Sequence, residues 1–219
     1  MKNKYWSSQN KTMSSELQEI KAPQQQQEIM LEERTMQLPP DSLEVVENRI
    51  YFYAEIDRDK ALRLNKTIDL LNNEFLVKAL TMKMASPPEI YLYINSFGGS
   101  ILDAFSILDS VLLSKIPINT VIDGCAASAA TLISVCGTKR YIKPHSYMLI
   151  HQLSSFVYGK YSEIEDEKEN LDKFMVMISD IYKKHTKMPS AKIKEILKHD
   201  LWLSSEEAIK WGLADEILR

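Results

Sequence analysis

The sequence is poor in the residues that build disulfide scaffolds and metal clusters. Its 219 residues include only two cysteines, Cys125 and Cys136, which lie in the same apolar stretch, and four histidines. Two cysteines in this arrangement form neither a disulfide framework nor a zinc-ligand pattern. The composition therefore favours a reducing compartment, and no metal and no cofactor are expected.

A long hydrophobic run is also absent. The longest run of apolar and small residues, 125–136, is too short to span a bilayer and contains serine and threonine. The first residues are polar and lack the apolar centre of a signal peptide. We therefore expect a cytoplasmic protein that does not associate with membranes.

Neither sign of charge dominates the sequence. The formal net charge is −3, and no cluster of lysine and arginine is dense enough to indicate a nucleic-acid-binding surface. Hydrophobic residues make up 45% of the chain and charged residues 26%, which is typical of a soluble domain. The length is sufficient for one domain with a substantial core.

The first 41 residues differ in composition from the rest. They contain four consecutive glutamines at 24–27 and scattered apolar residues, with prolines at 23, 39 and 40. Such a segment buries little apolar surface, so we expect residues 1–41 to be a mobile tail or a propeptide, with a partner-docking arm as the alternative. Residues 42–219 are predicted to form the folded domain.

From Leu43 onward, short apolar runs alternate with helical patterns. Strands are predicted at 49–53, 90–94, 118–122, 141–142 and 147–150, and helices at 57–75, 101–113, 130–135, 163–184 and 190–199. In the second helix, the large apolar residues Ile101, Phe105, Leu108 and Leu112 are predicted to form the buried stripe. Strands that alternate with helices predict an α/β fold.

Ser128 is the first candidate for chemistry. It lies in a run of small residues, Gly124 to Ala129, between a predicted strand and a predicted helix. A serine at such a turn has its hydroxyl near a helix N-terminus, where free N–H groups favour developing negative charge. Such a run alone is more typical of tight packing, so a nucleophile is predicted only if a base and an acid accompany it.

A catalytic serine needs a base, an acid that orients the base, and donors for the oxyanion. His151 follows a predicted strand and is the candidate base, with a structural histidine as the alternative. Asp200 precedes an apolar segment and is the candidate acid, with a solvated loop carboxylate as the alternative. Gly98 and Gly99 follow another strand and, with Ala129, offer unobstructed N–H groups, although a tight turn alone would also use two glycines.

In this order, these motifs resemble the proteolytic subunit of the Clp protease family, which consists of self-compartmentalising serine proteases. The resemblance covers about residues 48–218 and is carried by 90–96 with Gly98-Gly99, Gly124 with 126–128, 137–140, 148–152, Asp200 and 204–213. It implies a Clp-protease/crotonase-like α/β fold of repeated strand-strand-helix units with a protruding strand-helix handle.

The resemblance also implies residue roles. Ser128 would be the nucleophile, His151 the base and Asp200 the orienting acid of a serine endopeptidase that forms an acyl-enzyme. The N–H groups of Gly99 and Ala129 would form the oxyanion hole. The substrate would lie as an added strand against a substrate-binding set that comprises Gly98, Leu153, Ser154, Ser155 and Phe156.

Partners are implied in the same way. The family resemblance implies a homo-oligomer made of a heptameric ring or two stacked rings, a polypeptide substrate and an AAA+ unfoldase that makes proteolysis ATP-dependent. Three positions depart from the usual pattern: Phe97 replaces a proline, Leu153 and Ser155-Phe156 replace a proline and a glycine pair, and His199 replaces an arginine. The alternatives are a non-catalytic ring subunit that assembles with an active paralogue and a crotonase-type acyl-CoA enzyme.

Overall fold

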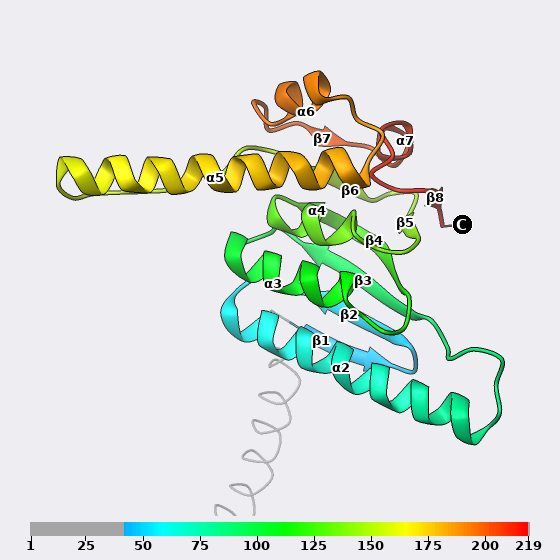
Figure 1. The fold of residues 1–219 in the computed structure, drawn as a ribbon. Coiled ribbons are helices and arrows are strands. Elements are labelled where there is room, and N and C mark those ends of the chain that lie inside the picture. Colours follow the sequence, from blue (N-terminus) through cyan, green and yellow to red (C-terminus); the bar gives the residue numbers. More distant parts are fainter. Residues whose placement is uncertain (1–41, 219) are drawn as a thin grey trace, which may run out of the picture. The chain divides into compact units, whose positions relative to one another are not determined.

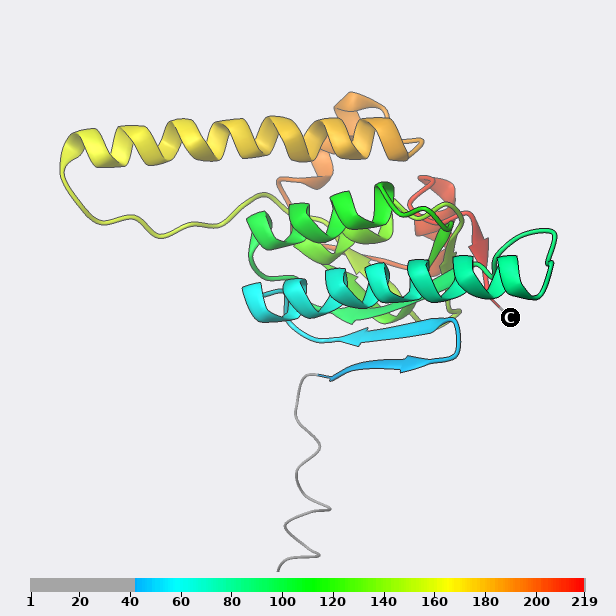
Figure 2. The ribbon, with the colours of Figure 1, turned by 60° about the horizontal axis from the view of Figure 1, so that its bottom comes forward.

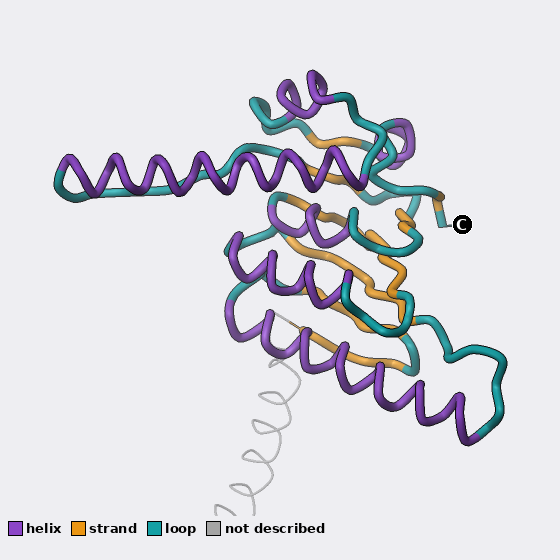
Figure 3. Tube along the Cα trace, in the orientation of Figure 1, coloured by secondary structure: helices purple, strands orange, loops and turns teal. Residues whose placement is uncertain are grey.

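The computed structural model describes residues 42–218, so the predicted tail at 1–41 lies outside the described residues. An eight-stranded sheet forms the centre of this domain, in the order β1-β2-β3-β4-β5-β8, while β6 pairs with β4 and β7 pairs with β6. Helices α2, α3 and α4 lie side by side over one face of the sheet (Figures 1 and 3). The predicted α/β class is confirmed.

The element bounds follow the predicted order closely. The strands are β1 (Ser42–Val46), β2 (Arg49–Tyr53), β3 (Ile90–Ser96), β4 (Ile118–Ala127), β5 (Arg140–Ile142), β6 (Tyr147–Leu149), β7 (Trp202–Leu203) and β8 (Glu216–Ile217). The helices are α2 (Arg58–Thr81), α3 (Ile101–Leu112), α4 (Ala129–Ser134), α5 (Tyr161–His185), α6 (Ser190–Ile196) and α7 (Ser205–Lys210).

The buried stripe of α3 differs from the predicted one. The helix buries Ala104, Ile107, Leu108 and Val111, whereas Leu112 is exposed. Leu108 belongs to both sets, and Ile101 and Phe105 are partly buried and pack against the core. The prediction was therefore right in part, and its error is that the buried face is centred on Ala104, Ile107 and Val111.

Strand β4 changes partner along its length. Its first part pairs with β5, as Thr120 opposite Arg140, and its last part pairs with β6, as Ala127 opposite Leu149. Between them, Gly124 has φ +97°, and a Cβ there would lie 2.7 Å from the Asn95 amide nitrogen. The glycine thus lets β4 continue to Ala127, beyond the predicted end at residue 122.

Helix α5 extends beyond the sheet. In both ribbon views its N-terminal half projects away from the other elements, and the chain that follows β6 runs outward beside it (Figures 1 and 2). Its buried residues, Ile178 and Tyr182, lie in the C-terminal half. This outward segment, 151–160, has no assigned strand, so the predicted protruding handle contains a helix and an extended segment without a strand. Within residues 42–218, no helix is long and apolar enough to cross a membrane.

Candidate active site

Ser128 occupies a strained turn between β4 and α4. Its backbone has φ +53° and ψ −128°, a region that residues other than glycine rarely adopt. The Ser128 N–H donates to the Leu149 carbonyl at 2.8 Å, and the Ser128 carbonyl accepts from the Thr131 N–H at 3.0 Å. These hydrogen bonds connect the turn to β6 on one side and to α4 on the other.

Strand register brings His151 to the same place. Because Ala127 pairs with Leu149, the residues that follow both strands leave the sheet together, which places His151 beside the Ser128 turn. Strands β6 and β7 are antiparallel, with Leu149 opposite Trp202. Continuing this register past the end of β6 sets His151 opposite Asp200, so one sheet edge gathers all three residues that the sequence singled out.

The three side chains are close but not joined by hydrogen bonds. His151 Nδ1 lies 3.6 Å from Asp200 Oδ1, which is too long for a hydrogen bond. The His151 side chain is 24% exposed, whereas that of Asp200 is 80% exposed. Among the described residues, no hydrogen bond joins the Ser128 hydroxyl to His151. The subunit as it stands therefore holds an open form of the arrangement.

Gly98 and Gly99 pack directly against this turn. Both have positive φ, and a Cβ on Gly98 would lie 2.7 Å from Ser128 Cβ. The Gly98 carbonyl accepts from the Ile56 N–H at 2.7 Å, and the Ser100 N–H donates to the Ile56 carbonyl at 2.8 Å. These bonds fix the loop without using the Gly99 N–H, and within residues 42–218 neither this group nor the Ala129 N–H donates a hydrogen bond.

A small cavity of about 30 Å³ joins these residues. Its lining combines residues of the candidate site with apolar side chains from α3, α4 and α5 and with the segment that follows His151. The lining residues are Gly99, Ile101, Ser128, Ala129, Leu132, His151, Gln152, Leu153, Ile178 and Tyr182. An apolar cavity beside a hydroxyl, an imidazole and two free N–H groups has the components that acyl transfer requires.

Apart from Gly98, the four other predicted substrate-binding residues lie along the segment beside α5. Leu153 lines the cavity, and its N–H approaches Met175 Sδ at 3.5 Å. Ser155 donates a hydrogen bond from Oγ to Glu167 Oε1 at 3.1 Å. Ser154 is exposed, and Phe156 is 92% exposed. Of these four residues, Leu153 alone lines the cavity.

Sequence reasoning missed two sets of contacts around the site. Thr131 and Tyr182 are buried below Ser128 and hydrogen-bond to each other. Phe97 and Trp202 meet edge to face, with ring centroids 6.3 Å apart, and so join the loop before Gly98 to β7. For Thr131 and Tyr182, the signal in the sequence was a threonine inside an apolar run. For Phe97 and Trp202, which are far apart in the chain, the contact becomes visible in the folded structure.

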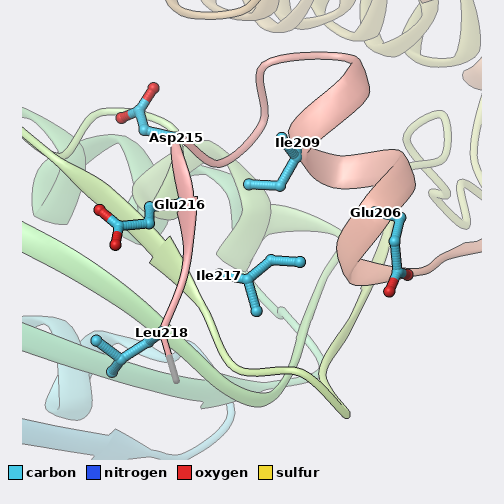
Figure 4. A pocket seen from close by; sticks show the side chains of 6 residues that line it. All are labelled: Glu206, Ile209, Asp215, Glu216, Ile217 and Leu218. Atoms are coloured by element: carbon cyan, nitrogen blue, oxygen red, sulfur yellow. The ribbon is translucent and has the colours of Figure 1, made fainter.

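A larger hollow lies elsewhere, between α7 and β8 (Figure 4). The side chains of Ile209 and Ile217 lie between these two elements, and the side chain of Glu216 points to the other side of β8. None of the residues singled out for catalysis lines it. Across residues 42–218, no group of three or more histidine, cysteine, aspartate or glutamate side chains could hold a metal ion.

Comparison with protein-family models gives one finding. Residues 44–219 match the model described as Clp protease. The matched range contains the whole sheet from β2 onward and every residue of the candidate site.

Proposed function

Because this chain belongs to the Clp protease family, we propose that it is a serine endopeptidase that cleaves unfolded polypeptides or short peptides. Membership of the family implies a peptidase. One observation carries the assignment of the catalytic roles. Ser128, His151 and the N–H groups of Gly99 and Ala129, which donate no hydrogen bond within residues 42–218, belong to residues that line one cavity.

In the proposed mechanism, His151 accepts the Ser128 proton as the oxygen attacks a peptide carbonyl. The Gly99 and Ala129 N–H groups donate to the oxyanion, and His151 then protonates the leaving amine. Water releases the acyl group by the same route. Asp200 accepts a hydrogen bond from His151 Nδ1 once the 3.6 Å separation closes, which fixes the tautomer with Nε2 facing the serine.

The proposed environment is an oligomeric chamber in the cytoplasm. The family forms oligomeric rings, and we propose a heptameric ring, alone or as a stacked pair, that receives polypeptide from an AAA+ unfoldase. Gly98 and the segment formed by Leu153, Ser154, Ser155 and Phe156 would pair with the substrate backbone as an added strand. This proposal uses no metal and no cofactor.

A non-catalytic ring subunit is the second candidate. It is favoured by the open His151–Asp200 pair and by the 80% exposure of the Asp200 side chain. A carboxylate in water orients an imidazole weakly, because water competes for its lone pairs. If the pair stays open in the assembled ring, the chain would support an active paralogue and would not itself cleave peptides.

Labelling with a fluorophosphonate probe, followed by intact mass, tests the function. The wild-type chain is expected to gain one adduct that is absent in Ser128→Ala and strongly reduced in His151→Ala. Ser86→Ala is the control, because this exposed serine in the loop after α2 does not line the cavity and should leave the adduct unchanged. A folded wild-type ring without an adduct would overturn the peptidase proposal and favour the ring-subunit candidate.

A further inference from the structure

A chain of three polar groups runs through the interior beneath Ser128. Thr131 Oγ1 donates to the Ser128 carbonyl at 2.5 Å, and Thr131 Oγ1 and the Tyr182 hydroxyl are 2.6 Å apart. A hydroxyl has one proton to donate. Since Thr131 uses its proton on the carbonyl, the Tyr182 hydroxyl must be the donor in the second hydrogen bond. The chain therefore runs from Tyr182 through Thr131 to Ser128.

Both hydroxyls are sealed from water. Thr131 is fully buried and Tyr182 is 2% exposed. Burial raises the pKa of Tyr182, so its hydroxyl keeps the proton that it donates. Without competing water, consecutive hydrogen bonds polarise one another, and the loss of one member leaves the next without a partner.

The anchored carbonyl and the Ala129 N–H belong to the same peptide group. A trans peptide is planar, so its C=O and N–H point in opposite directions and rotate together. Two hydrogen bonds to the carbonyl from Thr131 thus fix the direction of the Ala129 N–H on the other side. This restraint is significant because Ser128 adopts φ +53°, a conformation that a free chain would leave.

We propose that Tyr182 and Thr131 are positioning residues that aim the Ala129 N–H at the oxyanion. Tyr182 comes from α5 and Thr131 from α4, so the donor's direction depends on how the two helices pack. The catalytic consequence rests on the proposed peptidase function, whereas the orientation of the peptide group does not.

Hydroxyl-deletion variants test the proposal against a matched control. Tyr182→Phe and Thr131→Val remove one hydroxyl each. The conservative variant Thr131→Ser keeps a hydroxyl at position 131. Ser134→Ala is the control, because Ser134 is equally buried in α4 but donates to the Thr131 carbonyl at 2.9 Å and does not contact Ser128. For each variant, the maximal rate of fluorophosphonate labelling and its half-saturating probe concentration are measured, and a crystal structure is determined.

The two hydroxyl deletions are expected to lower the maximal labelling rate about 3- to 30-fold, less than the roughly 10²- to 10³-fold effect of deleting an oxyanion donor. The half-saturating concentration should hardly change, since the Tyr182 ring still lines the cavity. Thr131→Ser and Ser134→Ala should label like wild type. In the crystals, the Ser128–Ala129 peptide should be rotated in Tyr182→Phe and Thr131→Val only.

Equal rates in Tyr182→Phe and wild type, with an unrotated peptide, would overturn the proposal. A rate loss in Ser134→Ala as large as that in Tyr182→Phe would overturn it too, because general loosening of α4 would then suffice. If the wild-type chain takes no label, the peptidase function fails and the crystal structures alone decide. A peptide rotated only in the two hydroxyl deletions then supports the positioning role, and an unrotated one overturns it.

Discussion

At Gly98, the backbone of one loop touches the turn that carries Ser128. Replacing Gly98 with alanine would add a Cβ 2.7 Å from Ser128 Cβ and 2.8 Å from the Ala127 carbonyl oxygen, at φ +101°. The backbone must shift, since neither neighbour is a flexible side chain. We expect Gly98→Ala to abolish labelling of Ser128 by the fluorophosphonate probe. We also expect it to lower the free energy of unfolding by about 1–3 kcal/mol.

The control for Gly98→Ala is Gly159→Ala. There the added Cβ would meet the flexible carboxylate of Glu163, and φ lies outside the left-handed region. Urea unfolding and labelling of this variant should resemble wild type. A Gly98→Ala chain that labels at the wild-type rate would contradict the close packing of the glycine loop against the nucleophile.

His185 gives the domain a pH-dependent stability. Burial lowers its pKa, and the charges of Lys184 and Arg140 lower it further, so the unfolded chain binds the proton more tightly than the folded one. Stability should therefore be complete above the ordinary histidine pKa and should fall as the pH drops from about 7 to 5. His185→Gln should flatten the melting temperature against pH in that window.

Asp215 provides the comparison for this prediction. A hydrogen bond from Arg140 lowers the pKa of its carboxyl group, so its contribution to stability should be lost only as the pH falls below about 4. Asp215→Asn should alter the melting profile in that lower window. If His185→Gln and wild type gave superimposable profiles, the assignment to His185 would be wrong.

Residues with strong local constraints were the ones that the sequence could predict. Glycines at turns follow from local backbone chemistry, and so does the capping box that Ser204 and Glu207 form at the start of α7. Roles that depend on distant neighbours could not be predicted in this way. Thr131 and Tyr182 are 51 residues apart, and only packing brings them together. The catalytic roles of Ser128, His151 and Asp200 stay predictions.

At the scale of elements, β7 is short and, within residues 42–218, pairs with β6 alone, and Asp200 lies two residues before it. The edge-to-face contact between Phe97 and Trp202 gives β7 a second attachment, to the loop that begins the glycine turn. Such aromatic pairs contribute roughly 0.5–1.5 kcal/mol beyond burial. This contact therefore links the strand beside Asp200 to the loop that contains Gly98 and Gly99.

A double-mutant cycle with Phe97→Ala and Trp202→Ala tests this link. We expect a coupling free energy of about 0.5–1.5 kcal/mol in urea unfolding. Each single variant should also slow labelling, because β7 positions Asp200. A cycle with Phe97→Ala and Trp211→Ala serves as the control, since the Trp211 ring makes cation–π contacts with Lys192 and Lys210 and not an aromatic contact with Phe97. Additive effects in the first cycle would show that the rings do not interact in solution.

The order of elements was predictable because the apolar runs and the helical periods are both long. Strands β2, β3 and β6 and helices α3 and α5 lie where the sequence placed them, within a few residues, whereas α2 begins as predicted but continues to Thr81, six residues beyond the predicted end. Strands β7 and β8 were missed because two-residue strands carry no periodicity. The end of β4 was predicted too early because Gly124 resembles a turn, whereas in the sheet it fits a close approach to Asn95.

For the whole domain, the exposed apolar residues and the open His151–Asp200 pair both indicate that another copy packs against it. Helix α5 and the segment beside it expose large apolar side chains, among them Phe156, Tyr158, Tyr161, Val176 and Met177. Surfaces of this kind mark association sites. A copy packed against this region would also remove water from the neighbouring site, which would favour closure of the His151–Asp200 pair.

Labelling of Ser128 should therefore depend on assembly. We expect the rate per subunit to fall when the protein is diluted below the dissociation constant of the assembly, in step with the sedimentation coefficient, because the open pair activates the serine poorly. Val176→Glu should weaken assembly and labelling together, since Val176 is 63% exposed on α5. The matched control is Leu80→Glu, at a 79% exposed position near the end of α2, which should change neither. A Val176→Glu chain that sediments as a monomer but labels at the full rate would mean that one subunit completes the site alone, and the 3.6 Å separation would then close without a partner.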